Sequence, residues 1–234
     1  MEHKRLTLFA GHYGSGKTNI AVNYALHLAK EGKKVCIGDL DIVNPYFRTA
    51  DSAKELEAAG VDLISPQFAN SNVDLPALPA EAYRLVQDRS VYAIMDIGGD
   101  DRGAYALGRY APFIKQEDNY RMAFVANASR PLTRTPEEAL EVMREIEAAC
   151  GIAFTCIVNN TNLAAETTPQ TVLDSVAFIE KLCSLSTLPL WLHTAQQSVA
   201  SALEGQLLHV FPLQLQEKYF DLPSQKPQAR PLWG

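Results

Sequence analysis

An α/β fold, with a mostly parallel β-sheet between two layers of helices, is predicted by two features of this 234-residue sequence. Short, mostly apolar segments that suit strands alternate with segments that suit helices. The strand segments are nearly continuous apolar runs, which is typical of parallel strands covered on both faces. We therefore expect a three-layer sandwich whose ligands bind beyond the carboxyl ends of the strands.

The expected strands are the apolar runs, taken in chain order. The first, R-L-T-L-F-A, leads directly into a glycine-rich turn, and the last, L-P-L-W-L-H, is expected to complete the sheet. The predicted strands cover residues 5–10, 34–39, 61–65, 91–96, 120–126, 152–158 and 188–193.

Helix boundaries are marked by start and stop signals. Gly32 is expected to end the first helix, because glycine is favoured just after a helix. Thr135 as N-cap, Pro136 at the first helical position and Glu138 form a capping box that begins a later helix. The predicted helices cover residues 17–31, 50–59, 77–89, 101–115, 136–150 and 169–183.

Composition and length indicate a single domain. We expect a nucleotide-binding domain over residues 1–221, followed by a proline-rich tail over 222–234. The net charge of −6 argues against a general nucleic-acid-binding surface, which needs a basic balance. No apolar run is long enough to cross a bilayer, and the tail has too many prolines for a membrane-targeting amphipathic helix.

The cysteines predict a reducing compartment. Cys36, Cys150, Cys156 and Cys183 form no C-x-x-C pair, and each falls within a predicted strand or helix. We therefore expect reduced, buried thiols in a cytoplasmic protein.

The turn after the first strand matches the phosphate-binding pattern G-x-x-x-x-G-K-[ST]. Its glycines let successive backbone N–H groups point at phosphate oxygens, and the following helix adds its positive N-terminal end. Lys17 is expected to reach the β- and γ-phosphates, and the Thr18 hydroxyl to bind Mg²⁺. A chance match is the alternative, but a strand before the turn and a helix after it favour a phosphate site. The expected nucleotide-binding residues here are Gly11, His12, Tyr13, Gly14, Ser15, Gly16, Lys17, Thr18 and Asn19.

Acidic residues stand at the carboxyl ends of two other predicted strands. Asp39 and Asp41 end the second strand, and Asp96 ends the strand 91–96. A carboxylate beside a phosphate loop commonly helps to hold Mg²⁺. The turn Gly98-Gly99 is expected to offer a backbone N–H to a γ-phosphate, as switch segments do. The alternatives are that Asp39 and Asp41 are surface turn residues and that Asp96 caps the next helix.

These motifs together resemble those of the MinD/ParA-type ATPases, a deviant Walker A family in the SIMIBI class of P-loop proteins. The resemblance rests on G-H-Y-G-S-G-K-T, on the D-L-D after the second strand and on D-I-G-G after a later strand. It extends to V-A-N-A-S-R-P-L-T-R-T-P-E-E-A at 125–139 and to L-W-L-H-T-A-Q-Q-S-V-A-S-A-L-E-G-Q at 190–206. It implies ATP and Mg²⁺ as cofactors, an ATP-dependent homodimer and an unidentified protein partner.

The resemblance also implies roles for individual residues. Asp39 would orient or polarise the attacking water, with Lys17 as the second catalytic residue. Thr18, Asp41 and Asp96 would hold Mg²⁺, the two carboxylates through water. On the base side the implied residues are Asn159 and Asn160 beside the purine, and a loop of His193, Thr194 and Ala195 passing over it.

The phosphate loop departs from the family at one position. The family's signature lysine is replaced by His12, followed here by Tyr13. Arg48 is our first candidate for a replacement cation. Two alternatives stay open for Arg102, Arg109, Arg130 and Arg134: they serve as phosphate-side arginines, or, as we expect, they are solvated or paired structurally. Similarly, His3, His27, His193 and His209 show no metal-ligand spacing.

Three functions remain open from the sequence. The preferred one is a slow Mg²⁺-dependent ATPase switch that acts on a protein partner. The second is a P-loop small-molecule enzyme, such as a kinase or an ATP-dependent ligase, although residues 160–188 lack the arginines that a kinase lid usually carries. The third is a nucleotide-binding protein with little hydrolysis, which the His12 departure keeps open.

Overall fold

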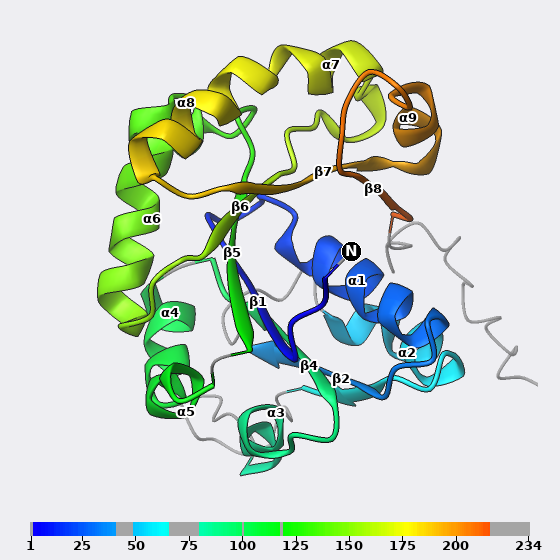
Figure 1. Cartoon of the computed structure of the whole chain (residues 1–234), viewed down its shortest axis with the longest axis vertical. Helices are drawn as coiled ribbons and strands as arrows, with labels where there is room; N and C mark the ends of the chain where they lie inside the picture. Colours follow the sequence, from blue (N-terminus) through cyan, green and yellow to red (C-terminus); the bar gives the residue numbers. More distant parts are fainter. Residues whose placement is uncertain (1, 41–48, 66–79, 100, 118, 216–234) are drawn as a thin grey trace, which may run out of the picture.

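A computed structural model of the chain describes residues 2–40, 49–65, 80–99, 101–117 and 119–215. In this part of the chain one central sheet separates two layers of helices, as Figure 1 shows. Asp41, Arg48 and the expected tail 222–234 lie outside the described residues.

The described residues form an eight-stranded sheet with the order β3-β2-β4-β1-β5-β6-β7-β8, in which every neighbouring pair is parallel. The predicted α/β sandwich is therefore confirmed. The final strand, β8, was not predicted, because its four residues are few and include Pro212. Proline lacks a backbone N–H, but an edge strand such as β8 tolerates it. The strands are β1 Leu6–Ala10, β2 Val35–Leu40, β3 Asp62–Ile64, β4 Tyr92–Ile97, β5 Tyr120–Ala126, β6 Cys156–Asn159, β7 Leu190–Gln196 and β8 Val210–Leu213.

Two of the predicted helices are interrupted. The helix expected over 101–115 breaks between α4 and α5, where Pro112 has no N–H to continue the first helix. The helix expected over 169–183 breaks at Ser175, whose hydroxyl donates to the Val172 carbonyl at 2.7 Å. The capping box at Thr135 is present. The helices are α1 Lys17–Lys30, α2 Ala53–Ala58, α3 Arg84–Gln87, α4 Asp101–Gly108, α5 Ala111–Lys115, α6 Pro136–Cys150, α7 Pro169–Asp174, α8 Val176–Ser186 and α9 Gln197–Ala202.

The described helices include none that is both long and apolar enough to cross a membrane. The cysteines, all in described segments, are free thiols. Burial raises the pKa of Cys36 and of Cys156 to about 11 each, so both are protonated at neutral pH. They are therefore packing residues rather than reactive ones.

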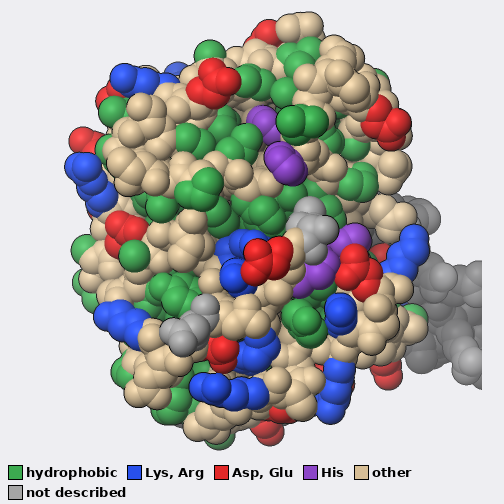
Figure 2. Space-filling view, in the orientation of Figure 1, with side chains coloured by type: hydrophobic (Ala, Val, Ile, Leu, Met, Phe, Trp, Pro, Cys, Tyr) green, Lys and Arg blue, Asp and Glu red, His purple; other side chains and the backbone are tan. Residues whose placement is uncertain are grey.

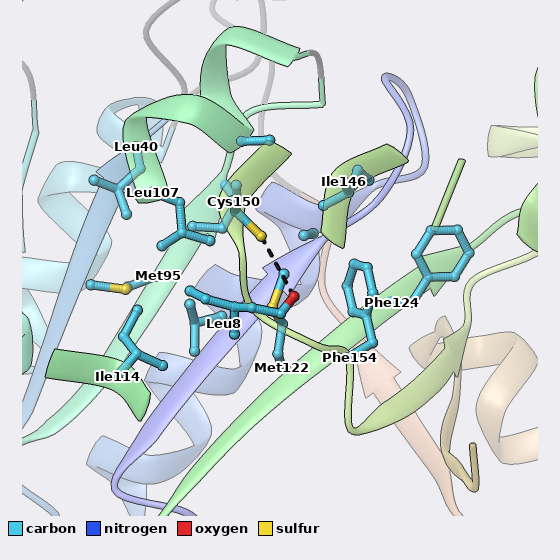
Figure 3. Packing of buried hydrophobic residues seen from close by; sticks show 14 of the residues in the cluster. Leu8, Leu40, Met95, Leu107, Ile114, Met122, Phe124, Ile146, Cys150 and Phe154 are labelled. Carbon is cyan, nitrogen blue, oxygen red and sulfur yellow. Dashed lines mark hydrogen bonds between the residues drawn. The ribbon is translucent and has the colours of Figure 1, made fainter. Parts of the chain in front are cut away.

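The two faces of the sheet build separate cores. Figure 3 shows one of them, in which Leu8, Met95 and Met122 pack with Leu107, Ile114 and Cys150. The other face packs against α1 through residues that include Phe9, Ile37 and Ile94.

Strand side chains alternate between the two faces, which fixes where the acidic residues point. Asp39 and Asp96 follow Ile37 and Ile94 by two residues each, so both carboxylates face the side of the sheet that α1 covers. The N-terminus of α1 carries the phosphate loop, and the fold therefore brings these carboxylates and the loop to the same corner.

Candidate functional site

The phosphate loop between β1 and α1 has a backbone that only glycine accommodates. Gly11, Gly14 and Gly16 have φ angles of 154°, 75° and 90°, which side chains strongly disfavour. A Cβ on Gly11 would lie 2.5 Å from the Val125 carbonyl oxygen, and one on Gly16 would collide with the Asn160 amide nitrogen. The loop is therefore shaped by strands β5 and β6 as well as by its own glycines.

The N-terminus of α1 has the properties of an anion site. Its N-cap is Gly16, and no side chain among the described residues caps it. The first turn of α1, described in full, contains no acidic residue. The first N–H groups of a helix need acceptors and carry a partial positive charge, so both properties favour a bound anion.

The side chain of Lys17 lies back across the loop, as the side chain of a phosphate-binding lysine would. Its side chain is buried, and Nζ is 3.4 Å from the His12 carbonyl oxygen that it faces. A buried ammonium group needs negative charge nearby. Thr18, half-buried at the next position, lies in the first turn of α1.

Three donors around the loop are buried without a partner among the described residues. They are the Ser15 hydroxyl, the Asn127 amide nitrogen and the Arg130 Nε. Buried polar groups in folded proteins are nearly always hydrogen-bonded, so such a group of donors calls for an acceptor. A phosphate group supplies several acceptor oxygens, and these residues therefore fit a nucleotide's phosphates.

For Arg130 the structure favours the phosphate-side alternative over a solvated or structurally paired side chain. A Cβ on Gly14 would lie 3.5 Å from the Arg130 Cζ, so the guanidinium covers the phosphate loop. Its backbone is fixed by bonds from Arg130 N to the Asn127 carbonyl and from Thr133 N to the Arg130 carbonyl, both 3.1 Å. The available signal was its position four residues after β5, at the ligand-binding edge of the sheet.

Asp39 and Asp96 form a pair of buried carboxylates. They are register partners on β2 and β4, their exposed fractions are 2% and 1%, and the Thr49 hydroxyl donates to Asp96 Oδ2 at 3.1 Å. Two neighbouring carboxylates in a buried site repel each other unless cations compensate them. Mg²⁺ binds through carboxylate and hydroxyl oxygens, so this pair, together with Thr18, fits a divalent ion.

The Gly98-Gly99 turn packs directly on the phosphate loop. A Cβ on Gly99 would lie 2.7 Å from the Tyr13 nitrogen and 2.8 Å from Lys17 Nζ. A Cβ on Gly103, in α4, would lie 2.5 Å from the Gly98 Cα. The turn therefore links Lys17 to α4 through contacts that leave no room for a side chain.

Asn160, expected beside the purine, is bonded to the phosphate loop. Its amide nitrogen donates to the Ser15 carbonyl at 2.6 Å, and its amide oxygen accepts from the Thr194 hydroxyl at 2.7 Å. Asn160 is buried, so both bonds are made away from water. This side chain holds the loop, β6 and β7 together, whatever contact it makes with a base.

The prediction that residues 193–195 form a loop is wrong. His193, Thr194 and Ala195 belong to β7 and are buried. The His193 ring nitrogen Nδ1 is 3.0 Å from the Asn159 amide nitrogen, and burial lowers the pKa of His193, so its ring is largely neutral at pH 7. The apolar pattern L-W-L-H predicts a strand that ends at His193, but β7 continues to Gln196.

Exposed apolar side chains stand around this corner. Tyr13, Leu132 and Leu163 are 52%, 58% and 49% exposed. They follow β1, β5 and β6, which are adjacent in the sheet. His12, next to Tyr13, is half-buried, and its Nδ1 lies 2.9 Å from the Tyr13 carbonyl oxygen.

The fold resembles those of solved proteins of the signal recognition particle and its receptor. The receptor FtsY of the signal recognition particle from Elizabethkingia anophelis, in complex with GDP, has a TM-score of 0.52 at 18% identity, over 83% of this chain and 58% of that one. Cell division protein ftsY from Thermotoga maritima gives 0.54 at 15% identity, over 81% and 61%. The 54 kDa signal recognition particle protein from Aeropyrum pernix, with GDP, gives 0.51 at 17% identity, over 82% and 41%.

The chain thus spans less than two thirds of the length of each of these structures. No model of a known protein family and no curated protein matches it. At these identities the likeness shows the fold alone. The chain has the α/β fold of the P-loop NTPases.

Proposed function

We propose that this protein is a Mg²⁺-dependent ATPase switch of the MinD/ParA type. The observation that carries the proposal is the contact of Gly99 with both Tyr13 and Lys17, beside the buried Asp39–Asp96 pair. A segment that touches the phosphate-binding lysine can respond to the presence of a γ-phosphate. Through Gly98 and Gly103 the same segment leads to α4, which would carry the response to a partner.

Each residue has a distinct role in this proposal. Lys17 and the N–H groups of α1 bind phosphate oxygens, and Thr18 holds Mg²⁺ together with Asp41 and Asp96, the two carboxylates through water. Asp39 orients the attacking water. The bound metal would supply charge neutralisation at the phosphates.

Arg130 is our proposed replacement for the family's signature lysine. Its guanidinium covers Gly14, two residues from His12, and its Nε is buried without a partner among the described residues. An arginine is always charged, so it can stabilise charge on a transferring phosphoryl group. In this proposal the cation comes from the same chain rather than from a dimer partner.

We expect Arg130→Ala to lower the rate of ATP hydrolysis by about 100-fold, because one preorganised donor to the phosphates is lost. Exposed Arg134, four residues later, provides the matched control, and Arg134→Ala should leave the rate unchanged. Adding His12→Lys to Arg130→Ala should restore part of the rate. An Arg130→Ala protein that hydrolyses ATP at the parent rate would show that Arg130 is not this cation.

We also expect the site to prefer ATP to GTP. Guanine-specific proteins commonly use an aspartate that accepts from two guanine donors, in an N-K-x-D motif. The corresponding residues here are Asn159, Asn160, Thr161 and Asn162, which include no carboxylate. The Asn162 amide is oriented by donating to the Asn160 carbonyl at 2.7 Å and accepting from the Ala164 nitrogen at 3.2 Å.

A competition titration with a fluorescent ATP analogue measures this preference. ATP should displace the analogue at a lower concentration than GTP. Displacement by GTP at an equal or lower concentration would contradict the proposed base preference while leaving the switch proposal intact.

The switch proposal itself predicts an ATP-dependent homodimer. The exposed side chains of Tyr13, Leu132 and Leu163 offer an apolar contact surface next to the site, and a two-fold assembly would cover it twice. Light scattering on the Asp39→Ala protein, in which turnover is slowed, should show a mass increase with Mg-ATP but not with Mg-ADP. A monomer in both states, combined with fast hydrolysis, would instead support a small-molecule enzyme.

A further inference from the structure

Two histidines and a glutamate come together at the end of α1 that is opposite the phosphate loop. His3 precedes β1, while His27 and Glu31 are one helical turn apart. The His3 Nε2 is 3.0 Å from Glu31 Oε2, and the His27 Nε2 is 3.2 Å from Glu31 Oε1. Figure 2 shows histidine and acidic side chains together on this face, beside the N-terminus marked in Figure 1.

The spacing of the three side chains suits a metal ion. One ligand atom from each residue can be chosen so that all three lie within 4.8 Å of one another. In a tetrahedral zinc site with bonds of about 2.0–2.1 Å, neighbouring ligand atoms are about 3.3 Å apart. The two nitrogen–oxygen distances are close to this value, so little movement would be needed to admit an ion.

His3 is held in the orientation that a ligand needs. Its other ring nitrogen, Nδ1, is 3.0 Å from the hydroxyl of Tyr24, a residue of α1 that is fully buried. Metal-binding histidines almost always have such a partner on the second nitrogen, because it fixes both the tautomer and the ring. On the other side, the His27 ring packs edge-on against Phe211, with the ring centroids 5.5 Å apart.

The local electrostatics also favour a cation. The C-terminal end of a helix carries a partial negative charge, and His27 and Glu31 belong to the last turn and C-cap of α1. A network of hydrogen bonds without any metal is the competing explanation for the same contacts.

We propose that His3, His27 and Glu31 form a binding site for a borderline divalent ion such as Zn²⁺. Imidazole and carboxylate are ligands that such ions prefer, and three protein ligands leave a coordination position open to solvent. The site lies at the far end of a 14-residue helix, about 20 Å from the phosphate loop. It is therefore distinct from the proposed Mg²⁺ site and does not depend on the proposed function.

Cobalt titration of the nucleotide-free protein tests the proposal, because Co²⁺ with four or five ligands absorbs visible light far more strongly than its aqua ion. We expect one equivalent to bind and Zn²⁺ to displace it. His27→Ala and Glu31→Gln, both at half-exposed or exposed positions, should each weaken binding at least about 10-fold. Exposed His209 provides the control, and His209→Asn, which suits its φ of 58°, should bind Co²⁺ as the parent does.

Melting curves of the variants without metal show whether each is folded, and a Zn²⁺-dependent rise in the melting temperature gives a second measure of binding. The rise should occur in the parent and in His209→Asn, and should be lost in Glu31→Gln. Parent protein that leaves Co²⁺ as its aqua ion, or equal affinities in the parent, His27→Ala and Glu31→Gln, would overturn the proposal and establish the hydrogen-bond network.

Discussion

Replacing Lys17 with alanine should weaken Mg-ATP binding by at least about 100-fold, or about 2.8 kcal/mol. The side chain of Lys17 is buried, and its ammonium group faces the carbonyl oxygen of His12, which belongs to the same loop. Loss of the Lys17 ammonium group removes a charge-assisted hydrogen bond to phosphate. The loop is preformed, so it cannot rearrange to replace that bond. Calorimetric titration with Mg-ATP measures the change directly.

The control for this experiment is a lysine elsewhere on the surface. Lys181 is exposed in α8, and Lys181→Ala changes the net charge of the protein by the same amount. It should bind Mg-ATP with the affinity of the parent. If Lys17→Ala and Lys181→Ala bind equally well, the loop between β1 and α1 is not a phosphate site.

The second large effect is expected from Asn160→Asp. The substitution keeps the shape of the side chain but removes the amide that donates to the Ser15 carbonyl at 2.6 Å, and places a carboxylate against that oxygen. A buried, uncompensated charge typically costs about 3–5 kcal/mol. We expect a loss of this size in the free energy of unfolding, measured by urea denaturation, together with weaker nucleotide binding because the loop loses its anchor.

Two further variants separate the charge from the lost bond. Asn160→Ala leaves the Ser15 carbonyl without its amide donor, while the Thr194 hydroxyl keeps the Asn159 carbonyl as an acceptor at 3.1 Å. It adds no charge, so its cost should be about 1–3 kcal/mol. Asn119→Asp makes the same amide-to-carboxylate change at an exposed position before β5 and should have little effect. Equal stabilities of Asn160→Asp and Asn119→Asp would show that Asn160 does not anchor the loop.

Much of the architecture was predictable because its signals are local. Alternating apolar runs and helical segments predicted the α/β sandwich, and Thr135, Pro136 and Glu138 predicted the start of α6. The glycine-rich loop between β1 and α1 was equally predictable, because its glycines are needed for the backbone angles within the loop. The errors arose where local signals compete with tertiary contacts, as at Ser175, whose hydroxyl accepts from the Asn159 amide at 2.8 Å. They also arose where a short edge strand such as β8 carries a proline.

What the sequence by itself determined is therefore the fold class, the glycine-rich loop between β1 and α1, and the acidic residues at the strand ends. Only the tertiary structure placed Arg130 over Gly14, made Asp39 and Asp96 neighbours, bonded Asn160 to Ser15, and brought His3 to His27 and Glu31. The physical reason is that each of these contacts joins residues distant in the chain, through the order of parallel strands and the packing of α1. Residue spacing reflects the period of one helix or strand, and it does not indicate which elements become neighbours.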